Sequence, residues 1–144
     1  MSKPTLFIGL HGPILLPNIQ PRDAYGQGRV AEYAKSFLHW AKDRFHVQLL
    51  TDEHLGAAHE IVNRLSLPTE QVVPRGFEVS KTEAMHPHES FYWIDSDLIP
   101  SEITWLHKND NVERFLCADP EVGVTPQHKE ILENLLRSDK RIKK

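Results

Sequence analysis

The sequence has 144 residues and a formal net charge of -3; 40% of its residues are hydrophobic and 26% are charged. These values are typical of one soluble globular domain, and they give no reason to expect nucleic acid or an anionic membrane as a general partner. The single cysteine, Cys117, excludes an internal disulfide framework, and its apolar neighbours predict a buried, unreactive thiol. Because no apolar stretch reaches transmembrane length and no signal peptide is evident, we expect a cytoplasmic protein without membrane contact.

The first half of the chain alternates short apolar runs with helical patterns. The apolar run 5–8 ends at Gly9 and predicts a buried central strand, and turn residues over 17–28 predict a surface loop. From Arg29, apolar residues recur at helical spacing: Val30, Tyr33, Ala34, Phe37, Leu38 and Ala41. A strand over 47–51 follows, and then a helix capped by Asp52, whose expected buried face is Leu55, Ala58, Ile61, Val62 and Leu65.

The second half continues the alternation. We expect a short strand over 69–73, one helical turn over 81–85, a strongly apolar strand over 91–95 and a fifth strand over 114–118. Pro100 starts a short helix with Ile103 and Leu106 directed inward. Thr125 caps and Pro126 opens the last helix, in which one face is formed by Ile131, Leu132, Leu135 and Leu136.

Strands that alternate with helices predict a mainly parallel central sheet of about five strands, covered by helices on both faces. This is a three-layer, Rossmann-like α/β fold. We expect a single domain over residues 1–136 and a basic, solvated tail over 137–144, for which a basic contact surface is the alternative.

In such a fold, ligands collect at the carboxyl ends of the central strands, so residues 9–13 are expected at the mouth of a site. The segment Gly9-Leu10-His11-Gly12-Pro13-Ile14 resembles the first motif of the haloacid dehalogenase superfamily, an apolar strand followed by Asp-x-Asp-Gly-Thr. Both family aspartates are absent: glycine stands in place of the first and histidine in place of the second.

The resemblance extends along nearly the whole chain. Leu49-Leu50-Thr51 is similar to the second motif, a strand that ends in Thr or Ser, and Lys81 is the best candidate for the lysine of the third. Trp93-Ile94-Asp95-Ser96-Asp97-Leu98 resembles the acidic fourth motif with its middle acid replaced by serine. Phe91 to Leu98, Trp105 and the segment 119–125 look similar to a small, nearly capless bacterial branch sometimes found with nucleic-acid end-repair proteins.

The resemblance implies a defined chemistry for an intact member. Its first aspartate attacks phosphorus, its second acts as acid and base, Thr and Lys hold the phosphoryl oxygens, and Mg²⁺ bridges the acids and the phosphate. Since glycine cannot be a nucleophile, the aspartyl-phosphate route is closed at Gly9. We therefore expect a vestigial site made of Gly9, His11, Thr51 and Lys81.

Each remaining site residue has two interpretations. Asp95, Asp97 and His11 are the candidate metal ligands, for a weakly bound Mg²⁺ or a transition metal, although His11 can equally be a neutral, hydrogen-bonded remnant. Thr51 either holds an anion or caps the following helix. Lys81 is either a ligand-binding residue or an ordinary exposed lysine.

Two classes of function follow. In the first, which we favour, the chain is a catalytically inactive pseudo-phosphatase that acts as a binding or regulatory module for a protein or nucleic-acid partner. In the second, it is a divergent metal-dependent hydrolase or phosphotransferase that uses His11, Asp95 and Asp97 on a nucleic-acid or phosphoprotein substrate.

Overall fold

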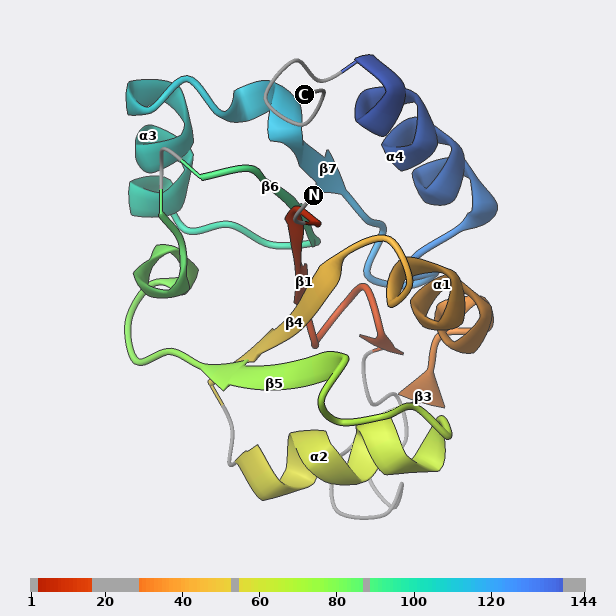
Figure 1. The fold of residues 1–144 in the computed structure, drawn as a ribbon. Coiled ribbons are helices and arrows are strands. Elements are labelled where there is room, and N and C mark those ends of the chain that lie inside the picture. Colours follow the sequence, from red (N-terminus) through yellow and green to blue (C-terminus); the bar gives the residue numbers. More distant parts are fainter. Residues whose placement is uncertain (1–2, 17–28, 53–54, 87–88, 139–144) are drawn as a thin grey trace.

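The computed structural model describes residues 3–16, 29–52, 55–86 and 89–138. Within these ranges, five parallel strands form one sheet in the order β5-β4-β1-β6-β7 (Figure 1). The strands are β1 (Thr5–Gly9), β4 (His46–Thr51), β5 (Val72–Gly76), β6 (Phe91–Asp95) and β7 (Phe115–Cys117). The expected α/β class with a five-stranded parallel sheet is confirmed.

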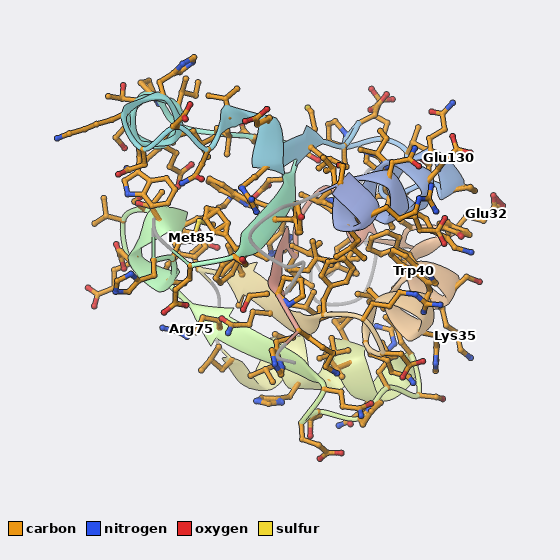
Figure 2. The ribbon with its side chains drawn as sticks, turned by 45° about the horizontal axis from the view of Figure 1, so that its top comes forward. Glu32, Lys35, Trp40, Arg75, Met85 and Glu130 are labelled. Carbon is orange, nitrogen blue, oxygen red and sulfur yellow. The ribbon has the colours of Figure 1, made fainter. Side chains whose placement is uncertain are left out.

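Helices cover both faces of this sheet. One face packs against α1 (Ala34–Ala41), α2 (Leu55–Arg64) and α4 (Pro126–Ser138). The other lies under the one-turn helix η2 (Lys81–Ala84) and α3 (Pro100–Lys108), and η3 (Val112–Arg114) leads into β7. Figure 2 shows Trp40 of α1 and Met85, just after η2, on opposite sides of the sheet. The arrangement is the predicted three-layer sandwich.

The two faces follow from the alternation of side chains along each strand. In β1, Leu6 and Ile8 belong to the core under α1 and α4, whereas Phe7 belongs to the smaller core under η2 and α3. The same alternation puts Trp93 of β6 in the smaller core. By this period of two, Gly9 and Asp95 are both directed toward the η2 side.

The expected start of the first helix at Arg29 is wrong. Residues Arg29–Val30 form a short strand, β3, which pairs antiparallel with β2 (Leu15–Leu16). The amide of Ala31 then donates to the carbonyl of Ile14 at 2.7 Å, and the helix begins only at Ala34. Val30 is therefore apolar as part of this ribbon rather than as part of a helix.

Three apolar residues expected to be buried are exposed: Leu55, Ile103 and Ile131. In α3 the inward positions are taken by Glu102 and Leu106, and in α4 by His128 and Leu132. Since residues four apart share a helix face, each pair turns its neighbouring isoleucine outward. Leu55 is the first residue of α2, at the end of the buried face that Ala58, Ile61, Val62 and Leu65 form.

Two further expectations need correction. Cys117 is exposed rather than buried, because β7 is the edge strand of the sheet. The third strand spans 72–76 rather than 69–73, since the carbonyl of Pro68 closes a turn by accepting from the amides of Gln71 and Val72.

The loop expected over 17–28 and the tail residues 139–144 lie outside the described residues. Among the residues that are described, no helix combines the length and the apolar character needed to cross a membrane.

Candidate functional site

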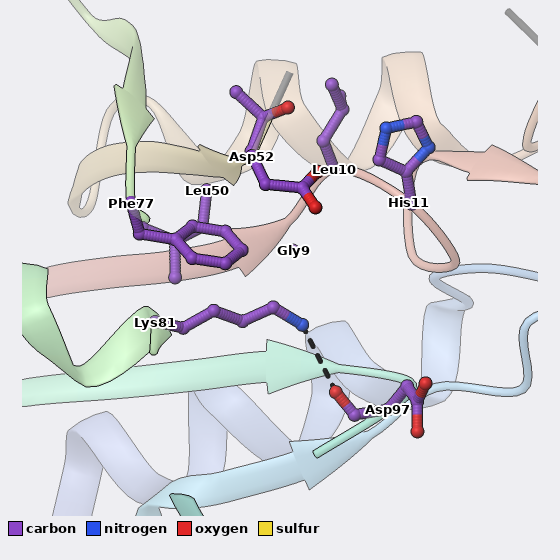
Figure 3. A pocket seen from close by; sticks show the side chains of 9 residues that line it. Gly9, Leu10, His11, Leu50, Asp52, Phe77, Lys81 and Asp97 are labelled. Atoms are coloured by element: carbon purple, nitrogen blue, oxygen red, sulfur yellow. Dashed lines mark hydrogen bonds between the residues drawn. The ribbon is translucent and has the colours of Figure 1, made fainter. Parts of the chain in front are cut away.

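A cleft of about 380 Å³ opens at the carboxyl ends of β1 and β4 (Figure 3). Its lining brings together the predicted site residues Gly9, His11, Thr51, Lys81 and Asp97 with four further residues. The lining residues are Gly9, Leu10, His11, Leu50, Thr51, Asp52, Phe77, Lys81 and Asp97. Asp95 does not line the cleft: its side chain is completely buried beside it. The motif positions therefore converge at one edge of the sheet.

Asp95 is held by three donors. Its Oδ2 lies 2.8 Å from Nζ of Lys81 and accepts from the indole Nε1 of Trp93 at 3.2 Å. Its Oδ1 accepts from the backbone amide of Ser96 at 2.8 Å. Both carboxylate oxygens are thus used inside the protein, and the ammonium group supplies the compensating charge that a buried carboxylate requires.

The Asp95 carboxylate lies over Gly9, where the resemblance would have the nucleophile. A Cβ atom placed on Gly9 would lie 2.5 Å from both Asp95 oxygens, which is closer than real Cβ contacts allow. The reason is the register, since Ile8 pairs with Ile94 and the next residues on the two strands are Gly9 and Asp95, directed to the same face. Gly9 is therefore the residue that makes room for the buried carboxylate.

Burial and the ammonium group act on Asp95 in opposite directions. Removal of the carboxylate from water raises the pKa of Asp95 above its ordinary value of 3.8, and this outweighs the charge of Lys81 and the hydrogen bonds from Ser96 and Trp93, which lower it. Burial of the ionised carboxylate therefore costs folding free energy. Shifted pKa values of buried acids are typical of functional sites.

Lys81 reaches Asp95 from the opposite wall of the cleft. Its Nζ also donates to the backbone carbonyl of Asp97 at 3.1 Å and lies 5.9 Å from the ring centroid of Phe77. Figure 3 shows the lysine side chain crossing the cleft to the backbone of Asp97, whose carboxylate group points away from the lysine. Because only 16% of the Lys81 side chain is exposed, its charge is directed to these oxygen atoms rather than to solvent.

The backbone of Lys81 is fixed by a buried acid on a different helix. Glu102, in the first turn of α3, is 2% exposed, and its Oε2 accepts from the amide of Lys81 at 2.7 Å. Its Oε1 accepts from the amide of Ile99 at 3.1 Å, which caps α3. One carboxylate thus joins the start of α3 to the residue that carries the ammonium group.

A second carboxylate closes the turn before Lys81. Glu83 accepts from the backbone amides of Ser80 and Val79, both at 2.9 Å, and of Glu78 at 3.1 Å. These hydrogen bonds, that of Ser80 first, hold the pKa of Glu83 below its ordinary value. Ser80 completes the capping box by accepting from the amide of Thr82. The position of Lys81 is therefore set by two acids, Glu83 and Glu102.

His11 and Thr51 lie on the β1 and β4 side of the cleft. Thr51 is buried at the end of β4 and His11 is exposed in the turn after β1. That turn is closed by two backbone bonds between Leu10, Gly12 and Leu15, and Gly12 has a φ of +106°, which favours glycine. The turn packs against Ser96, so the segment after β1 and the segment after β6 are in direct contact.

The residues present do not fit the Mg²⁺ that the family resemblance implies. Mg²⁺ requires near-octahedral oxygen ligands, whereas Gly9 offers no side chain, His11 offers nitrogen, and the Asp95 oxygens already accept from three donors. Across the described ranges, no group of three His, Cys, Asp or Glu side chains is placed to hold a metal ion. The expected metal set of Asp95, Asp97 and His11 is not assembled in this structure.

Sequence reasoning missed the residues that shape the site: Phe77, Ser80, Glu83 and Glu102. Two signals were available. Ser80-x-x-Glu83 has the spacing of a capping box, and Glu102 stands three residues after Ile99, at a helix start marked by Pro100. No comparable signal indicated Phe77.

No family model matches this sequence, and no curated protein matches it significantly. The resemblance to the haloacid dehalogenase superfamily therefore depends on the motif residues themselves and on the parallel α/β sheet that places them.

Proposed function

We propose that this chain is a pseudo-phosphatase of the haloacid dehalogenase type, which acts as a binding or regulatory module. The observation that carries this proposal is the filled space above Gly9. In a phosphatase of this type the nucleophile would be a side chain carried by residue 9. The Asp95 carboxylate occupies the space that such a side chain would need, and it is bound there to Lys81, Trp93 and Ser96.

The geometry gives less support to a rebuilt hydrolase that uses His11, Asp95 and Asp97. Such an enzyme would need its carboxylates free to act on a substrate held near His11. Asp95 has no exposed surface, does not line the cleft and is bound to three donors, so of the two acids only Asp97 reaches the cleft. We therefore keep the hydrolase only as the alternative that turnover measurements would reveal.

The cleft is nonetheless retained at the place where α/β proteins bind their ligands. Its polar lining includes His11, Asp52, Lys81 and Asp97, and Phe77 adds an apolar wall. In the described part of the chain, the elements over this edge of the sheet are short and form no separate cap domain. This openness suits a protein or nucleic-acid partner better than a small enclosed metabolite.

The binding role is tested by a comparison of partner retention. The purified protein, immobilised, is exposed to native lysate alongside a His11→Ala variant, which alters an exposed cleft residue, and a His107→Ala variant, which alters an exposed histidine on α3. We expect a partner that the wild type and His107→Ala retain and that His11→Ala loses. Retention that is absent from the wild type, or equal in all three, would contradict the binding proposal.

A further inference from the structure

We propose that the ammonium group of Lys81 takes the place of a divalent cation in this site, so that the cleft operates without metal. This concerns a property of the site itself and goes beyond the binding role, since it stands whether or not the cleft binds a macromolecule. It follows from the disagreement between the residues present and the Mg²⁺ that the resemblance implies.

The first step is the set of oxygen atoms that Lys81 occupies. Its Nζ lies 2.8 Å from Oδ2 of Asp95 and 3.1 Å from the carbonyl oxygen of Asp97. A carboxylate and a backbone carbonyl at one strand end are ligands that hard cations prefer. The ammonium group already satisfies both.

The second step is the fixed position of the lysine. A surface lysine would exchange freely between partners, but the Lys81 amide is bound by the buried Glu102 and most of its side chain is shielded from solvent. The charge is therefore held at Asp95 as a built-in counter-ion. A divalent cation would have to displace it against both the anchored backbone and the ion pair.

The third step is the role of Gly9. Any side chain on β1 at this position would force the Asp95 carboxylate away from its present place. Glycine allows Asp95 to fold back over β1 and to meet Lys81 inside the protein. The glycine and the ion pair are thus two parts of one arrangement that replaces an acid and a metal.

The test is a Lys81→Met variant, because methionine keeps much of the side-chain length and leaves the amide that binds Glu102. Its matched control is Lys42→Met, which removes the lysine of the ion pair with Asp43, outside the cleft, and changes the net charge equally. Terbium is the probe cation, since it prefers oxygen ligands and its luminescence is sensitised by a nearby indole. Trp93 supplies that indole, hydrogen-bonded to Asp95.

We expect Lys81→Met to bind terbium about tenfold or more tightly than wild type, because one neighbouring like charge typically shifts an ionic equilibrium by a power of ten or more. The gain should disappear in Lys81→Met with Asp95→Asn, and Lys42→Met should match wild type. A gain no larger than that of Lys42→Met would overturn the proposal.

The wild type provides a second test that does not depend on the folding of any lysine variant. Its terbium emission should equal that of Asp95→Asn, since Asp95 is closed to cations while Lys81 holds it. Circular dichroism verifies that the variants are folded. Saturable emission from wild type that Asp95→Asn abolishes would show a metal site and overturn the proposal.

Discussion

The carboxylate of Asp95 lies in the space that a side chain on Gly9 would need, because a Cβ there would be 2.5 Å from both of its oxygen atoms. This relationship joins two residues that look independent in the sequence. The absence of a side chain at Gly9 leaves room on β1, and Asp95 on β6 fills that room and pairs with Lys81. The space over Gly9 is thus filled by the Asp95 carboxylate and is not an empty place left by a missing side chain.

A Gly9→Ala substitution is expected to lower the free energy of unfolding by about 1–3 kcal/mol, because the added methyl group overlaps the Asp95 carboxylate. Gly76→Ala is the control at the end of β5, two strands away in the same sheet, since a Cβ there would meet its nearest atom at an ordinary 3.8 Å. Urea denaturation measures both. Equal effects at the two glycines would contradict the steric relationship.

The same contact predicts coupling between the two residues. Asp95→Ala removes the carboxylate, so Gly9→Ala should cost less in that background than in wild type, by about 0.5–3 kcal/mol. The measurement is a double-mutant cycle from four urea denaturation curves. Additive effects would mean that Gly9 and Asp95 do not compete for the same space.

Asp95 also predicts how stability depends on pH. Because burial raises its pKa, the folded protein holds the Asp95 proton more tightly than the unfolded chain. The contribution of Asp95 to stability should therefore fall as the pH rises from the ordinary value of 3.8 through the raised folded value, and then stay constant. The free energy of unfolding of wild type minus that of Asp95→Asn isolates this term, and an increase with pH would show that Lys81 outweighs burial.

Glu102 is predicted to position Lys81 through the backbone. Glu102→Ala leaves the amides of Lys81 and Ile99 without their acceptor and should cost about 1–3 kcal/mol for each amide that stays buried. Amide hydrogen exchange at Lys81 should become faster. Glu130→Ala, on the exposed surface of α4 (Figure 2), should change stability by about 0.5 kcal/mol or less.

If Glu102→Ala leaves exchange at Lys81 unchanged, another group must hold η2 in place. Wild-type exchange at Lys81 together with a loss of stability would mean that Glu102 stabilises only the start of α3.

The strands could be predicted because their apolar runs are short and bounded by turn residues, as in β1 and β6. Their carboxyl ends then brought Gly9, Thr51 and Asp95 to one edge of the sheet. The helix faces were less predictable, because a periodicity of apolar residues assumes that polar ones face solvent. Glu102 and His128 are directed inward and turn Ile103 and Ile131 outward.

These inward polar residues are explained by the hydrogen bonds that they make, of which the one from Lys81 to Glu102 joins residues far apart in the chain. His128 bridges the amide of Thr125 and the carbonyl of Cys117, and Glu102 binds the amide of Lys81. The relation of Asp95 to Gly9 likewise depends on the pairing of β1 with β6, which no local pattern encodes. Motif spacing therefore located the site, while cross-strand geometry determined what fills it.

Hydrolysis of p-nitrophenyl phosphate by the purified protein, with and without Mg²⁺, tests the central claim most directly. We expect a rate equal to that of a buffer blank in both conditions, since no carboxylate is placed to attack phosphorus from the end of β1. Mg²⁺-dependent turnover by the wild type that is lost in His11→Ala and kept in His107→Ala would contradict the claim and establish a rebuilt hydrolase.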